Sequence, residues 1–307
     1  MNQPRRLPRL TVNGVLLLDK PPGLSSNAAL QSARRLYNAA KAGHTGTLDP
    51  LATGLLPLCF GEATKFAGEL LEADKTYVAT VCLGITTDTA DAEGQVLATK
   101  AVNVSQTELE AVLRRFTGEI MMVPPMYSAL KRDGKPLYEY ARQGIELERS
   151  ARRVTIQSIE LHHFAGDLFS ITVACSKGTY IRTLAEDVGA ALGCGAHLTA
   201  LRRIRIGRLQ LEQAISLNEL DLLLPQRRTE LLLPVDALLD QLPCAKLETL
   251  DAARLGQGQA VRWNGAVGRW RAYAGETFLG LCELAADGWL YPRRLICNSV
   301  ENTPANA

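Results

Sequence analysis

The sequence predicts an α+β fold, in which a mainly antiparallel mixed sheet flanked by helices is followed by a small C-terminal β-barrel. Short apolar runs alternate with turn residues along most of the 307-residue chain, as in sheets built from sequential strands. Two capping boxes, Ser105–Glu108 and Ser216–Glu219, mark helix starts between these runs. After Pro243 the helical patterns give way to evenly spaced short strands. We therefore predict a large domain over 1–247, a small domain over 248–300 and a polar tail over 301–307.

The first half of the large domain predicts strands joined by tight turns. The apolar run Gly14–Lys20 is expected to form a core strand, which the following Pro-Pro-Gly turn ends. One of the serines after this turn can cap a helix. The alternating residues 75–84 predict a second strand, and a polar turn over 86–94 leads to a third. Strands that follow one another in this way pair most simply as an antiparallel meander.

One segment of the large domain lacks a core pattern. The capping box at Ser105 begins an amphipathic helix, and residues 154–161 and 168–175 return to strand patterns. Between Pro124 and Arg152 the chain is instead rich in basic residues and tyrosines. We interpret residues 124–152 as a mobile basic insertion, a loop and a helix that extend from the core.

The small domain predicts a helix near residues 250–255 and then four short strands. Their expected ranges are 260–263, 270–273, 278–284 and 289–295. Asp287-Gly288, between the last two, is a strong hairpin signal. A closed barrel is the arrangement that leaves such strands without exposed edges.

Composition places the chain among ordinary soluble proteins. The seven cysteines form no CxxC pair and mostly lie in apolar runs, which is typical of buried free thiols in a reducing compartment. The apolar run at 15–18 is too short for a signal peptide, and no stretch approaches the length of a membrane span. We predict a cytoplasmic protein, and nothing in the sequence requires an oligomer.

Charge is unevenly distributed, although the net charge is only +2. Residues 1–41 contain seven Lys or Arg and the single acid Asp19, and residues 202–208 contain four arginines and no acid. In the second segment Ile204 and Ile206 alternate with Arg203 and Arg205, so a strand would point these two arginines off one face. A solvated strand face is the ordinary alternative, but several basic patches together favour a nucleic-acid partner.

A glycine-rich loop from Gly43 to Leu56 encloses a single acid, Asp49. Glycines at 43, 46 and 54 permit backbone turns and close approach of a ligand, and Pro50 restricts the chain directly after the carboxylate. Such a loop is typical of a binding or catalytic site, yet an ordinary turn with a solvated aspartate has the same composition.

The absence of several common motifs limits the kinds of reaction that the chain is expected to catalyse. The sequence has no Walker motif, no GxGxxG after a strand, no HExxH and no closely spaced metal ligands, so we predict no cofactor and no metal. A lone carboxylate can act as a nucleophile or as an acid or base. Arg182, at a predicted strand-to-helix junction, could hold a carboxylate in a fixed geometry. Its alternative partner is Glu186, four residues later on the same helix.

Five segments together resemble one enzyme family. They are Lys20-Pro-Pro-Gly-Leu-Ser-Ser26, the Gly43–Leu56 loop, Lys75-Thr-Tyr77, Gly178-Thr-Tyr-Ile-Arg182 and Leu201-Arg-Arg. In this order and spacing they resemble the TruB family of tRNA pseudouridine synthases, from about residue 12 to the end of the chain. The resemblance implies a pseudouridine synthase fold, and the small domain is similar to the PUA fold, which accompanies several RNA enzymes.

The resemblance also implies a reaction and roles for individual residues. Uridine 55 in the T-loop of tRNA would be isomerised to pseudouridine without cofactor or metal. Asp49 would be the catalytic carboxylate, whether it attacks the sugar, attacks the base or promotes elimination through a glycal. Arg182 would orient Asp49 and keep it ionised. Tyr77 would stack on the target base and could carry a proton, and the pocket would be lined by Tyr180 and Leu201.

Further positions would support the loop and contact RNA. By resemblance Lys20 supports the active-site loop, and His44 inserts into the stack that the extruded base leaves. The basic insertion resembles the thumb that closes over the T-loop. Phosphate contacts would come from Arg202, Arg203, Arg205 and Arg208.

The expected partner is therefore the T-arm of tRNA, with no membrane and no obligatory protein partner. The insertion favours a stand-alone monomeric enzyme over relatives that work with accessory proteins. Two alternatives remain open from the sequence: a tRNA-binding module or chaperone with little catalysis, and a synthase that acts on another RNA.

Overall fold

The computed structural model describes residues 8–297, and the predicted tail over 301–307 lies outside this range. A ten-stranded mixed sheet forms the large domain, with the order β14-β1-β3-β12-β4-β11-β10-β7 and with β13 and β2 at its sides. Its strands are β1 Gly14–Lys20, β2 Ala42–His44, β3 Thr53–Phe60, β4 Lys75–Leu83, β7 Gly118–Met122, β10 Arg152–Ala165, β11 Leu168–Cys175, β12 Ala196–Ile206, β13 Leu209–Gln210 and β14 Ile215–Ser216. Most pairs are antiparallel, but β1 pairs with β14 and β12 with β3 in parallel.

Capping serines start three of the described helices where the sequence predicts. Ser25 caps α1, Ser26–Leu36, by accepting a hydrogen bond from the backbone of Ala28. Both predicted capping boxes are formed, at the starts of α2, Gln106–Arg115, and α5, Leu217–Leu222. The other helices are α3 Leu137–Ala141, α4 Ile181–Ala191, α6 Pro225–Glu230, α7 Thr249–Gly256 and the 3₁₀ segments η1 Gly61–Leu71, η2 Leu211–Gln213 and η3 Ala237–Leu239.

Strand β1 is covered on both faces, which explains its continuous apolar run. Leu16 and Leu18 belong to an apolar cluster that also contains side chains of α1, α2 and α4. Val15 and Leu17 point the other way, into a second cluster that η1 and the C-terminal domain complete. The strand that ends at Lys20 is therefore held between two hydrophobic cores.

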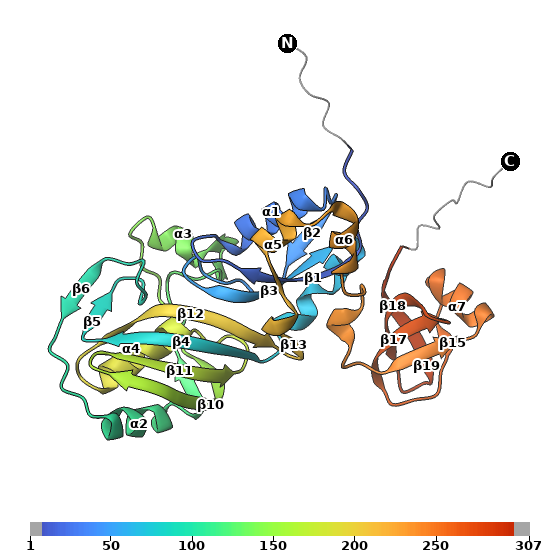
Figure 1. Ribbon diagram of the computed structural model, residues 1–307. Coiled ribbons are helices and arrows are strands. Elements are labelled where there is room, and N and C mark those ends of the chain that lie inside the picture. Colours follow the sequence, from blue (N-terminus) through green and yellow to red (C-terminus); the bar gives the residue numbers. More distant parts are fainter. Residues whose placement is uncertain (1–7, 298–307) are drawn as a thin grey trace, which may run out of the picture.

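The C-terminal domain forms a separate lobe at one end of the molecule (Figure 1). Its five-stranded sheet has the order β15-β17-β18-β19-β16, with β15 Cys244–Leu247, β16 Val261–Arg262, β17 Gly268–Ala274, β18 Thr277–Leu284 and β19 Trp289–Leu295. The four predicted strands are present, and β15 precedes them. The predicted closed barrel is wrong in one respect, since no pairing joins β15 to β16 within the described residues.

The basic insertion contains little regular structure. Between β7 and β10 it forms only a short hairpin, β8 Lys131–Arg132 and β9 Lys135–Pro136, and the helix α3. A second hairpin, β5 Ile85–Thr87 with β6 Val96–Thr99, frames the predicted polar turn. None of the helices in the described part of the chain has both the length and the apolar character needed to cross a bilayer.

Candidate active site

Asp49 lies in the turn between β2 and β3, and the side chain of Lys20 is hydrogen-bonded to this turn. The Lys20 side chain is completely buried at the end of β1. Its ammonium donates hydrogen bonds to the carbonyls of Leu24 at 2.6 Å and Pro50 at 3.3 Å. Burial lowers the pKa of Lys20 to about 8, an effect that the Asp49 carboxylate opposes. The residue next to Asp49 is thus tied directly to a core strand.

Ser26 attaches the same turn to helix α1. Its hydroxyl donates to the Leu48 carbonyl at 2.9 Å and accepts from the Leu48 amide at 2.8 Å. Leu48 itself is buried in the main apolar cluster. Asp49 therefore follows a residue whose backbone is bonded on both sides, which restricts where its carboxylate can point.

Arg203 lies inside the protein and holds both ends of the loop. The side chain is 1 % exposed, and its guanidinium donates to the carbonyls of Leu55 and Gly46, both at 2.8 Å. The expectation that Arg203 shares a surface face with Arg205 and contacts phosphate is wrong for this structure. A β-bulge between these residues, opposite Tyr77 and Thr76, breaks the alternation and turns Arg203 inward.

Gly54 allows the loop to pass over Arg203. Its φ is +97°, and a β-carbon there would lie 2.3 Å from the Arg203 carbonyl oxygen. We expect Gly54→Ala to lower the free energy of unfolding by about 4 kcal/mol or more, because backbone atoms cannot move aside cheaply. Denaturant unfolding followed by circular dichroism measures this.

The matched control for Gly54→Ala is Gly134→Ala in the insertion. Gly134 has a similar φ of +79° but nothing within 4 Å of the added carbon. Only the strained backbone conformation should therefore lower the free energy of unfolding, by about 1–2 kcal/mol. Equal losses for the two variants would show that the contact with Arg203 is unimportant.

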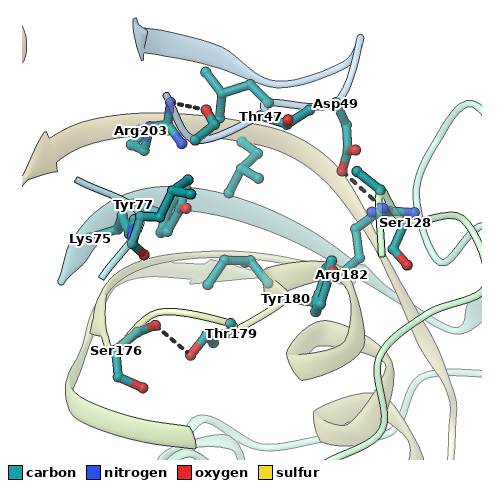
Figure 2. A pocket seen from close by; sticks show the side chains of 17 residues that line it. Thr47, Asp49, Lys75, Tyr77, Ser128, Ser176, Thr179, Tyr180, Arg182 and Arg203 are labelled. Atoms are coloured by element: carbon teal, nitrogen blue, oxygen red, sulfur yellow. Dashed lines mark hydrogen bonds and ion pairs between the residues drawn. The ribbon is translucent and has the colours of Figure 1, made fainter. Parts of the chain in front are cut away.

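Asp49 and Arg182 form an ion pair in the wall of a cavity, which the dashed line between them in Figure 2 marks. The Arg182 Nη2 atom lies 3.0 Å from Asp49 Oδ2, and the side chains are 5 % and 38 % exposed. Arg182 stands in the first turn of α4, where the buried face of the helix holds it. The structure therefore places Arg182 against Asp49, and not against Glu186 as in the alternative.

Asp91 is a second carboxylate at Arg182 that the sequence analysis missed. Its Oδ2 lies 3.6 Å from Arg182 Nε, and both side chains are 5 % exposed. The turn over 86–94 brings it there, because Ala90 bonds to Leu198 of β12 and adopts a φ of +58°. Thr89 fixes the carboxylate further by donating to Asp91 Oδ1 at 2.6 Å. The only local indication that this turn contributes to a site was its high content of acidic residues and threonines.

The surroundings determine how readily Asp49 ionises. Burial raises the pKa of the Asp49 carboxyl, Arg182 opposes this rise, and the nearby Asp91 adds to it. The Arg182 guanidinium thus lies against two carboxylates, and the Lys20 ammonium adds a smaller stabilising charge at Asp49. The ionised form of Asp49 depends on Arg182 staying in place.

The cavity beside Asp49 has a volume of about 270 Å³, which suits one flat ring better than a larger ligand. Tyr77 and Tyr180 lie in its wall with Asp49 and Arg182 (Figure 2), and Leu201 also lines it. Burial raises the pKa of the Tyr77 hydroxyl, although Arg203 opposes the rise. Tyr77 is therefore a neutral phenol at ordinary pH, and its hydroxyl can donate a hydrogen bond.

His44 lies at the end of β2, at a second and larger cavity. This cavity, of about 630 Å³, also reaches Asp49 and Arg182, and the insertion contributes Tyr138 and Arg142 to it. Burial, and then the charge of Arg203, lower the pKa of His44. The imidazole is thus neutral near pH 7. Its buried Nδ1 has no hydrogen-bond partner among the described residues.

The other three arginines predicted to contact phosphate differ in whether they already form ion pairs within the protein. Arg202 binds Asp19 through two hydrogen bonds of 3.1 and 2.7 Å, and Arg208 lies 3.8 Å from Asp240. Arg205 is exposed and forms no ion pair within residues 8–297. Of the four arginines, Arg205 is the most available to a ligand.

Comparisons with known proteins agree across the chain. Three family models match in succession: the N-terminal domain of the TruB family pseudouridylate synthases at residues 34–181, the tRNA pseudouridylate synthase B C-terminal domain at 182–240, and the pseudouridine synthase II TruB C-terminal model at 243–296. Among curated relatives, tRNA pseudouridine synthase B of Dechloromonas aromatica (strain RCB) is 58% identical over 93% of this chain and 96% of its own length. That of Azoarcus sp. (strain BH72) is 59% identical over 95% and 97%.

A solved structure supports the same fold. The matching chain of a Cbf5-Nop10-Gar1 complex has a TM-score of 0.68 at 27% identity, and the match covers 88% of this chain and 78% of that one. The mixed sheet and the C-terminal sheet are therefore an architecture shared with the matching chain of that complex.

Proposed function

The chain belongs to the TruB family of pseudouridylate synthases, and we propose that it converts uridine 55 in the T-loop of tRNA to pseudouridine. The observation that carries the proposal is the pair of Asp49 and Arg182 at 3.0 Å, on a cavity sized for one ring. Binding alone would not require a carboxylate in a site that receives a polyanion. The arrangement suits a reaction at a single nucleotide.

We propose that Asp49 is the group that acts on the nucleotide. The uracil must leave C1′, rotate and reattach through C5, so the N1–C1′ bond breaks and a C5–C1′ bond forms. C5 gives up its proton to a general base or to solvent, and N1 takes up a proton in its place. No electrons are gained or lost, and no cofactor is needed. Attack on the sugar, attack on the base and elimination through a glycal all use an ionised carboxylate, and the charge of Arg182 favours that form at the partly buried Asp49.

Aromatic side chains would offset the free-energy cost of removing the target uracil from its stack in the RNA. Removing a stacked base costs about a few kcal/mol, and stacking it on Tyr77 would return about 1–3 kcal/mol. His44, neutral and half-buried at the rim, would replace the extruded base in the stack. Tyr77 and Tyr180 would then hold the uracil beside Asp49.

We further propose that the chain acts as a monomer in the cytoplasm, without an accessory protein. The insertion supplies Ser128 and Ala129 to the cavity wall, and the carbonyl of Tyr127 accepts a hydrogen bond from Arg182 Nη2 at 2.6 Å. One chain thus provides all sides of the pocket.

The proposal is tested with purified protein and unmodified tRNA. Chemical mapping of pseudouridine should show modification of the T-loop uridine, and a tRNA with cytidine at that position should remain unmodified. A protein that binds tRNA but forms no product would be a binding module. Product in ribosomal RNA alone would point to a synthase with another substrate.

We expect tRNA affinity to fall steeply with salt concentration, because phosphate contacts release counterions. Replacing Arg205 with Gln should reduce the slope of log Kd against log salt by about one, since this exposed residue forms no ion pair within residues 8–297. Filter binding over a salt series measures both. A flat plot for the unaltered protein would contradict phosphate recognition.

A further inference from the structure

The basic insertion leaves and rejoins the sheet at one pair of residues, Met122 of β7 and Arg152 of β10. Both contact Tyr180, which lies in the wall of the small cavity. The Tyr180 amide donates to Met122 Sδ at 3.3 Å, and the Arg152 guanidinium carbon lies 5.2 Å from the centre of the Tyr180 ring. The base of the insertion therefore holds this residue from two sides.

Arg152 also fixes the turn in front of helix α4. Its Nη2 donates to the Gly178 carbonyl at 3.0 Å, and a β-carbon on Gly178 would meet the guanidinium carbon at 3.5 Å. The guanidinium thus lies against the backbone of Gly178 and the ring of Tyr180 at once. Two residues after Tyr180 comes Arg182, the partner of Asp49.

We propose that Arg152 is a positioning residue that couples the insertion to the uracil pocket. When RNA fixes the insertion, Arg152 sets the Tyr180 ring and the start of α4, and through them the alignment of Arg182 with Asp49. This inference rests on the proposed function. It differs from a phosphate contact, because the guanidinium is directed to protein groups and acts on the reaction step after tRNA is bound.

The test compares Arg152→Leu with Arg153→Leu. Arg153 is the neighbouring residue of β10 and carries the same charge, but its side chain is exposed. Its Nη1 atom lies 3.4 Å from Glu119 Oε2 of β7. With enzyme in saturating excess over unmodified tRNA, we expect the single-turnover rate constant of Arg152→Leu to fall about tenfold, the factor that a partly buried cation–ring contact can supply. The Kd of the two variants should agree, and Arg153→Leu should react at the rate of the unaltered protein.

Two further variants guard against a purely structural effect. Arg152→Lys keeps a cation beside the ring and should react within about threefold of the unaltered protein. In a Tyr180→Leu background, Arg152→Leu should cause a clearly smaller loss than in the unaltered protein, because the contact with the ring is already absent and only the hydrogen bond to Gly178 remains to be removed.

Each other outcome has a definite meaning. A raised Kd with a smaller salt slope and an unchanged rate at saturation would make Arg152 a phosphate contact and overturn the inference. So would an equal loss in both leucine variants, an Arg152→Lys rate as low as that of Arg152→Leu, or full additivity with Tyr180→Leu. If the unaltered protein forms no pseudouridine, it is the proposed function that fails.

Discussion

Replacing Asp49 with asparagine is expected to reduce pseudouridine formation by at least about 10⁴-fold, because an amide cannot supply the negative charge that acid, base or nucleophilic catalysis requires. The fold should persist, since the turn is held by Lys20 and Ser26 through backbone groups. Affinity for tRNA should change by less than about threefold, as the substitution removes no phosphate contact. Single-turnover mapping and filter binding on the same preparation separate the two effects.

The control for this variant is Asp74→Asn, which removes one exposed carboxylate outside the cavity. It should modify tRNA at the normal rate. Product formation by Asp49→Asn at a comparable rate would exclude Asp49 from the chemistry, and loss of binding together with loss of the folded state would make the experiment a measure of stability.

Replacing Arg182 with glutamine is expected to lower the maximal rate by about 10²–10³-fold, the usual effect of removing one preorganised charge from an active site. It should also move the acid limb of the pH profile upward. Burial already raises the pKa of Asp49 and Arg182 opposes this, so without Arg182 the pKa rises further. Because the ionised form is the active one, activity is then lost at a higher pH as the solution is acidified.

Arg182→Lys separates charge from geometry. A lysine keeps the positive charge, so the acid limb should stay near its normal position. It cannot reproduce the contacts of the guanidinium with Asp49, Asp91 and the carbonyl of Tyr127, so the maximal rate should still fall. Rates measured from pH 5 to 9 and thermal unfolding of each variant provide the comparison. An unmoved acid limb in Arg182→Gln would contradict the role of its charge.

Local signals explain the parts of the fold that could be predicted. The strand at Gly14–Lys20, the capping boxes and the four C-terminal strands each depend on a few adjacent residues. The contact between Asp49 and Arg182 could not be predicted from such local signals. Spacing alone was equally consistent with a solvated Asp49 in an ordinary turn and with an ion pair between Arg182 and Glu186. The family resemblance supplied what local physics could not, because it carries information about long-range contacts.

Two residues show where pattern reasoning fails. Asp91 reaches Arg182 only because its turn bonds to Leu198 on a distant strand, and no local property of residues 86–94 encodes that bond. Arg203 is buried because a bulge shifts the strand by one residue. Alternation of apolar and basic residues looks the same with or without a bulge, so the sequence predicted the opposite face.

The apolar cluster between the two domains has a consequence for how the protein unfolds. Leu55 of β3 and Phe66 of η1 belong to the same cluster as Phe278 of β18, and Phe66 and Phe278 pack edge to face at 5.6 Å. Leu55 is also the residue whose carbonyl Arg203 holds. The C-terminal sheet therefore packs against the strand that follows the Asp49 loop. Because the two lobes share this cluster, we expect them to unfold in one cooperative transition.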